Sequence, residues 1–115
     1  MITIEEFKDY VLQIADEGEV VFADDFSKEE YQYWKFFFSL VKADGYVKDA
    51  WPITRAFKPV LTDKGRVFYD CGGYSNQLNE KKQVKAINLM KSVAFDTLKQ
   101  VVSNIPVELV KQMFH

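Results

Sequence analysis

The stretch from Ser27 to Gly45, SKEEYQYWKFFFSLVKADG, constrains the fold more than any other part of this 115-residue chain. Ser27 followed by Glu30 forms a capping box, which marks a helix start, and Gly45 suits the left-handed turn past a helix end. At about 100° per residue, five polar side chains fall within an arc of roughly 80°: Lys28, Gln32, Lys35, Ser39 and Lys42. The aromatic and aliphatic side chains lie on the rest of the circumference. A surface helix usually has an apolar stripe little wider than about 100°. The sequence therefore predicts a helix that neighbouring elements cover on at least two sides.

A second helix is predicted over residues 4–17, ahead of the aromatic one. Thr3 and Glu6 make another capping box, apolar residues then recur at helical spacing, and Gly18 ends the run. Between the two helices, residues 20–22 predict a brief strand, with Val21 and Phe22 expected to face the aromatic helix. Residues 23–26 would lead to the Ser27 cap.

Residues 46–60 are rich in β-branched and aromatic side chains and predict two short strands joined by a loop near residues 50–53. Pro52 and Pro59 confine these strands to edges or ends of a sheet. Thr62 then predicts the N-cap of a short helix, with Phe68 and Cys71 on one face, which the pair of glycines at 72–73 stops.

The last segment, from about residue 79, predicts a long amphipathic helix that Pro106 kinks or restarts. One apolar face is expected to close the core: Val84, Ile87, Ala94, Leu98 and Val101. An overlapping face is expected to stay exposed and to form a homodimer interface: Phe95, Leu98, Val102, Ile105 and Leu109. Two alternatives stay open. In the first, residues 107–115 fold back over this apolar stripe and cover it within one chain. In the second, the lysine-rich residues 79–85 lie on an anionic membrane surface.

The order of these elements resembles a small winged-helix domain, specifically the uncharacterised bacterial and phage-associated proteins of the YjcQ-like kind. The residues that carry the resemblance are Gly45-Tyr46-Val47 and the run Leu61-Thr62-Asp63-Lys64-Gly65-Arg66. It implies an α+β, mainly α, winged-helix domain over residues 1–74, with residues 75–115 as a helical extension packed on the same domain or on a second subunit. Only the eight residues 19–26 stand where a helix-turn-helix places its positioning helix.

The polar side chains of the aromatic helix suggest a function. The net charge of −2 conceals an acidic segment, residues 1–27 with net −7, followed by residues 28–66 with net +3. Lys and Gln side chains on an exposed helix face suit contacts to base edges and phosphates in duplex DNA. The candidate DNA-binding residues are Lys28, Gln32, Lys35, Ser39 and Lys42 on the helix, with Arg55 and Lys58 on the second wing strand. We therefore expect a DNA-binding transcriptional regulator of the kind that mobile elements encode. The alternative is a winged-helix interaction or assembly module that does not bind DNA.

Other classes of function have little support in the sequence. Cys71 is the single cysteine and His115 the single histidine, so we expect no disulfide, no metal site and no cofactor. No motif for a catalytic nucleophile is present, and we expect no enzyme. Cys71 is expected to be an inert, partly buried thiol, and the aromatic side chains of residues 31–38 to pack in a core and not to stack on bases. With no signal peptide and no membrane span predicted, a cytoplasmic protein is expected.

Overall fold

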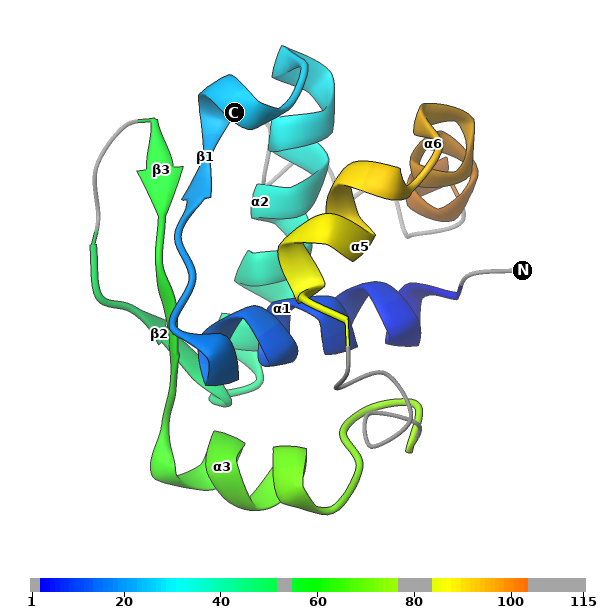
Figure 1. Cartoon of the computed structure of the whole chain (residues 1–115). Coiled ribbons are helices and arrows are strands. Elements are labelled where there is room, and N and C mark those ends of the chain that lie inside the picture. The colour runs from blue at the N-terminus through cyan, green and yellow to red at the C-terminus, as the bar shows by residue number, and fades with distance from the viewer. Residues whose placement is uncertain (1–2, 52–54, 77–83, 104–115) are drawn as a thin grey trace.

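Two helices packed on each other form the centre of the fold. The computed structural model describes residues 3–51, 55–76 and 84–103 (Figure 1). Helix α1, Ile4–Glu17, begins where the Thr3 hydroxyl accepts a hydrogen bond from the Glu6 N–H at 3.2 Å. It ends at Gly18, whose φ of 72° is left-handed. The prediction of a helix over residues 4–17 is confirmed.

Helix α2, Lys28–Ala43, is the aromatic helix that the sequence predicts. Ser27 and Glu30 make the reciprocal capping box, with the Glu30 N–H donating to the Ser27 hydroxyl and the Ser27 N–H to the Glu30 carboxylate. Past its end, Gly45 has a φ of 85°. Both ends of the helix therefore follow from hydrogen bonds within a few residues of chain.

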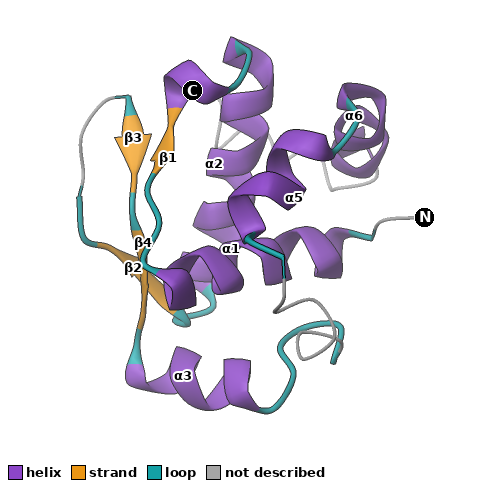
Figure 2. Ribbon diagram, in the orientation of Figure 1, coloured by secondary structure: helices purple, strands orange, loops and turns teal. Residues whose placement is uncertain are grey.

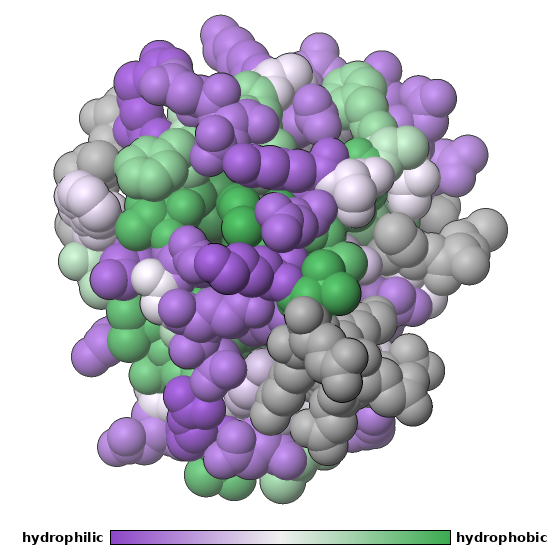
Figure 3. Space-filling model, viewed as in Figure 1, coloured by the Kyte–Doolittle hydropathy of each residue, from purple (hydrophilic) through white to green (hydrophobic). Residues whose placement is uncertain are grey.

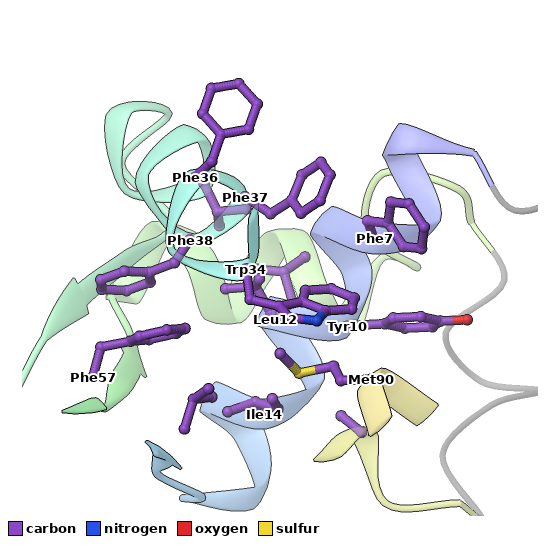
Figure 4. Close-up of a cluster of buried hydrophobic side chains, with 14 of the residues drawn as sticks. Phe7, Tyr10, Leu12, Ile14, Trp34, Phe36, Phe37, Phe38, Phe57 and Met90 are labelled. Atoms are coloured by element: carbon purple, nitrogen blue, oxygen red, sulfur yellow. The ribbon is translucent and has the colours of Figure 1, made fainter. Parts of the chain in front are cut away.

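Aromatic rings fill the contact between α1 and α2 (Figure 4). The Phe7 ring of α1 lies 5.4 Å from the Trp34 ring and 5.1 Å from the Phe37 ring, centroid to centroid. All three side chains are fully buried. On the neighbouring side of α2, Phe38 stacks on Phe57 at 4.7 Å. Trp34 and Phe37 lie in the core, as the sequence predicts.

The connection between α1 and α2 is a strand and a single turn. Strand β1, Val21–Phe22, precedes a 3-10 helix, η1, over Ala23–Asp25. The predicted strand is confirmed, but the expectation that both of its side chains face the aromatic helix is wrong. Adjacent side chains of a strand point to opposite faces. Val21 is buried, and Phe22 is 43% exposed on the outer face.

The remaining strands form a bent antiparallel ribbon beside α2 (Figure 2). They are β2, Val47–Asp49; β3, Ala56–Phe57; and β4, Pro59–Leu61. β1 pairs with β3, and β2 pairs with β4. Because only Lys58 separates β3 from β4, one stretch of chain carries both pairings. Pro59 is the first residue of its strand, where a missing N–H is tolerated.

Helix α3, Asp63–Asp70, begins within the run from Leu61 to Arg66, and two residues of that run have clear structural roles. The Thr62 hydroxyl accepts from the Gly65 N–H at 2.9 Å and donates to the Gly45 carbonyl at 2.6 Å. A Cβ on Gly65 would lie 1.8 Å from the carbonyl oxygen of Tyr46, so only glycine fits there. The run therefore docks the start of α3 against the end of α2.

At the end of α3, the predicted stop is confirmed, but the predicted burial of Cys71 is wrong. Gly72 and Gly73, both with positive φ, follow the helix as predicted. Cys71 is exposed, so the expectation of a partly buried thiol is wrong. Tyr69 takes the buried position instead, because α3 is a short helix with Gly65 and Tyr69 on its inner side.

Within the described residues 84–103, the chain forms two short helices and not one long helix: α5, Ala86–Ser92, and α6, Phe95–Ser103. The chain breaks at Val93, which is extended and buried, and the Ser92 hydroxyl donates to the Leu89 carbonyl at 2.9 Å. Such bonding competes with helix continuation. Pro106, where the break was predicted, lies outside the described residues.

This break changes which side chains close the core. Ala86, Met90, Val93 and Leu98 are buried, whereas Val84 and Ala94 of the predicted inner face are exposed. Two residues of the predicted dimer interface, Leu98 and Val102, are buried within this chain, so the expectation that they form an exposed stripe is wrong. A third, Phe95, is half-buried and stacks on Tyr33. Ile105 and Leu109 lie outside the described residues. Dimerisation itself stays a prediction.

None of the helices within residues 3–51, 55–76 and 84–103 combines the length and the apolar character that crossing a membrane requires.

Candidate nucleic-acid interface

A line of polar side chains runs along one face of α2, and we call it the polar seam: Lys28, Gln32, Lys35, Ser39 and Lys42. Lys28 and Lys42, at its ends, are exposed, and the three residues between them are half-buried. The helical spacing predicted this line, and the structure places it at the surface. The α1-facing residues Trp34 and Phe37 lie about half a turn away at 100° per residue, so α1 is on the opposite side of α2.

The polar seam is a narrow strip between buried aromatic side chains. On one flank, the Tyr31 and Phe38 rings pack on Phe57 of β3 at 5.8 and 4.7 Å. On the other flank, Phe36 is fully buried and points away from α1 (Figure 4). The Lys35 ammonium lies 5.8 Å from the Tyr31 ring centroid. Because both flanks are buried, α2 does not project from the surface.

A groove lies at the N-terminal end of the seam, where η1, α2 and the residue before β3 meet. Its volume is about 590 Å³, and its lining is Ala23, Asp24, Phe26, Lys28, Tyr31, Gln32 and Arg55. The Arg55 guanidinium donates a hydrogen bond to the Asp24 carboxylate across it. The groove therefore brings together two seam residues and one of the two predicted wing residues. The other, Lys58, lies between β3 and β4 and does not line the groove.

Acidic side chains of the connection between α1 and α2 form ion pairs with the rest of the chain. Glu19 pairs with Lys85 at 3.8 Å and Asp25 with Lys91 at 3.7 Å, so both tie this connection to α5 and the residue before it. Asp24 is the acidic residue that lines the groove. The acidic N-terminal segment therefore enters the predicted basic surface at its Lys28 end.

The Tyr31 hydroxyl is buried beneath this groove, and none of the described residues forms a hydrogen bond with it. Burial raises the pKa of Tyr31, the carboxylate of Asp49 raises it further, and Arg55 opposes both effects. The phenol is thus neutral at physiological pH and adds no negative charge to the groove floor.

Sequence reasoning missed a polar stripe on α1. Asp9, fully buried, accepts hydrogen bonds from the N–H groups of Tyr74 at 2.7 Å and Ser75 at 3.0 Å, and from the Ser75 hydroxyl. The Tyr74 hydroxyl donates to Asp44 at 2.6 Å, and its pKa is raised by burial and by this carboxylate. Asp9 therefore fastens the turn after α3 to α1.

Gln13 and Glu17 continue this stripe at intervals of four residues. The Gln13 amide donates to the Val84 carbonyl at 2.5 Å, and both Glu17 carboxylate oxygens accept from the Ala86 N–H at 3.2 Å. Lys85, the N-cap residue of α5, makes no side-chain cap. Glu17, a residue of α1, instead accepts the hydrogen bond from the N–H at the start of α5. In the sequence, only one feature indicates this stripe: Asp9, Gln13 and Glu17 recur at every fourth position on an otherwise apolar helix face.

Among the described residues, no three His, Cys, Asp or Glu side chains gather in a way that could hold a metal ion. Comparisons of the chain with family models, with curated proteins and with solved structures found no match.

Proposed function

We propose that this chain is a winged-helix domain that binds duplex DNA through the polar seam of α2. The order of elements supports this: α1, strand β1, helix α2, then β2 and the β3–β4 ribbon as a wing. In this interpretation η1 stands where the positioning helix of a helix-turn-helix would be. The likeness to YjcQ-like proteins adds the same expectation.

The observation that carries the proposal is the placement of all five seam residues at the surface along one line. Lys28, Lys35 and Lys42 recur every seven residues, hence about every 10.5 Å of helix. Lysines at that spacing can contact separate phosphate groups, and Gln32 suits the edge of an adenine. Arg55, in the groove beside Lys28, would add a further phosphate contact.

The recessed position of α2 limits how the seam can bind. A helix that reads bases must enter a major groove roughly 8.5 Å deep, and α2 is flanked on both sides by buried side chains. We therefore propose that phosphate contacts dominate and that discrimination between sequences is small. About five such contacts imply a log–log slope of affinity against salt of roughly −4 to −5.

Fluorescence anisotropy with a labelled duplex at low salt tests this proposal. Lys35→Glu should abolish binding, since it places a negative charge against phosphates in the middle of the seam. Lys8→Glu is the matched control, because α1 lies on the opposite side of α2 from the seam. Equal losses in both variants would show a general charge effect and would contradict a seam-specific site.

A second candidate is a winged-helix interaction module that binds a protein and not DNA. Two observations favour it: Asp24 holds Arg55 inside the groove, and α2 does not project. Absence of binding to any duplex at low salt would leave this candidate in place of the first.

A further inference from the structure

The outer face of the sheet carries the two exposed aromatic side chains of the described residues, Phe22 and Trp51. They are 43% and 44% exposed, and their ring centroids lie 6.4 Å apart with the planes at 78°. Figure 3 shows apolar surface over β1 and β3, broken up by polar side chains. Because the other aromatic rings of the described residues are buried or partly buried, this exposed pair requires an explanation of its own.

The pairing of the strands identifies the neighbours of this pair. Phe22 lies opposite Ala56, so the two side chains share a face, and Val21 and Phe57 share the core face. Alternation along the ribbon then places Lys58 and Val60 on the outer face. Lys48 lies opposite Val60 and joins them. The aromatic pair therefore shares its face with two lysines.

The backbone holds both rings in place. The Asp49 carboxylate accepts hydrogen bonds from the Trp51 N–H at 3.0 Å and from the Lys58 N–H at 3.2 Å, which fixes the turn that carries Trp51. Phe22 is in the β1 ladder, and the Ala23 N–H next to it donates to the Arg55 carbonyl at 2.8 Å. A surface with rings fixed in this way loses little entropy on binding a flat ligand.

We propose that this outer face binds single-stranded nucleic acid, with unpaired bases stacking on Trp51 and Phe22. Aromatic rings beside cationic side chains are what such sites combine: a base stacks on a ring, and Lys or Arg holds the adjoining phosphate. Lys48 and Lys58 supply the cations. A duplex would not serve, since its base faces are already stacked.

This site is separate from the polar seam, and the inference does not depend on the proposed duplex function. Trp51 and Phe22 contribute to the sheet face, whereas Lys35 and Lys42 lie along α2. A change in one surface can therefore be measured without loss of the other.

The test uses anisotropy of a labelled oligothymidylate of about ten nucleotides, within the site size of roughly 4–16 nucleotides for such surfaces. A second probe of equal length carries abasic sites throughout. We expect the wild-type chain to bind oligothymidylate more tightly than the abasic strand. Trp51→Ala should weaken oligothymidylate binding by about 5- to 100-fold, and Trp51→Phe should keep most of it. Duplex affinity should be unchanged by Trp51→Ala.

Val67→Ala is the matched control, because Val67 is an exposed apolar side chain on α3 outside the sheet. Circular dichroism of each variant verifies that the fold is retained, which is expected since both side chains are at the surface. Equal affinity for the two strands, or an unaltered affinity in Trp51→Ala, overturns the proposal. Absence of any binding at low salt also overturns it and leaves this face to a protein partner.

Discussion

Aromatic side chains occur in two contrasting regions of this molecule, the α1–α2 contact and the outer face of the sheet. In the first, Phe7, Trp34 and Phe37 are fully buried against one another. In the second, Phe22 and Trp51 meet edge to face and stay nearly half exposed. The same kind of side chain therefore holds the fold together in one region and is available to a ligand in the other. The surroundings of an aromatic side chain, and not its residue type, decide between these two roles.

Truncation of a buried ring should give the largest effect. Phe37→Ala empties a large volume between α1 and α2, and we expect it to cost about 3–5 kcal/mol of unfolding free energy. Urea denaturation followed by circular dichroism measures this cost. Phe22→Ala, the matched truncation on the outer face, should cost about 0.5 kcal/mol. Similar losses in the two variants would remove the contrast between the regions.

Gly65→Ala should give the next largest effect, without removing any contact. The added Cβ would lie 1.8 Å from the Tyr46 carbonyl oxygen, a backbone atom that cannot move alone. Overpacking of this kind costs roughly 1–3 kcal/mol, so the denaturation midpoint should fall clearly. Val67→Ala, two residues later on the same helix and exposed, should leave the midpoint close to that of the wild type. An unchanged midpoint in Gly65→Ala would show that α3 is not docked as closely as described.

The helix starts could be predicted because their signals are local. Thr3, Ser27 and Thr62 each cap a backbone N–H three residues later, and the spacing alone shows this. The polar seam is local for the same reason, since helical periodicity places its residues on one line. The groove could not be predicted, because Asp24 and Arg55 are 31 residues apart.

The wrong predictions depend on distant contacts. A two-residue strand has no periodicity that could show which way Phe22 points, and only its pairing with β3 decides it. The break at Val93 reflects burial of that side chain against the rest of the fold. The role of Asp9 could not be predicted, because the backbone groups that it binds lie 65 and 66 residues away in the chain. In the sequence it is one of several acidic residues in an acidic segment.

Asp9→Ala tests whether a buried polar group can matter as much as a buried ring. Removal of the carboxylate leaves the Tyr74 and Ser75 N–H groups without their acceptor, which costs roughly 1–3 kcal/mol. Urea denaturation should show this loss, and Asp9→Asn should recover part of it by keeping one acceptor oxygen. Asp70→Ala is the control, because Asp70 is exposed on α3 and forms an ion pair with Arg66 at 3.7 Å. Matching losses at the two positions would refute an anchoring role for Asp9.

Asp24→Asn should give the smallest effect, and it bears on the Lys28 end of the polar seam. Asp24 lines the groove with Lys28 and holds Arg55, so its charge opposes the approach of a phosphate to both. Neutralising it should strengthen duplex binding about threefold at low salt and by less as salt increases, because the interaction is solvent-exposed and screened. Asp25→Asn is the matched control: Asp25 pairs with Lys91 and does not line the groove. Anisotropy titrations of both variants at two salt concentrations measure the difference.

A gain confined to Asp24→Asn would locate the phosphate contacts at the Lys28 end of the seam. Weaker binding in this variant would mean that the Asp24–Arg55 pair shapes the site, and equal gains in both variants would mean that only net charge matters.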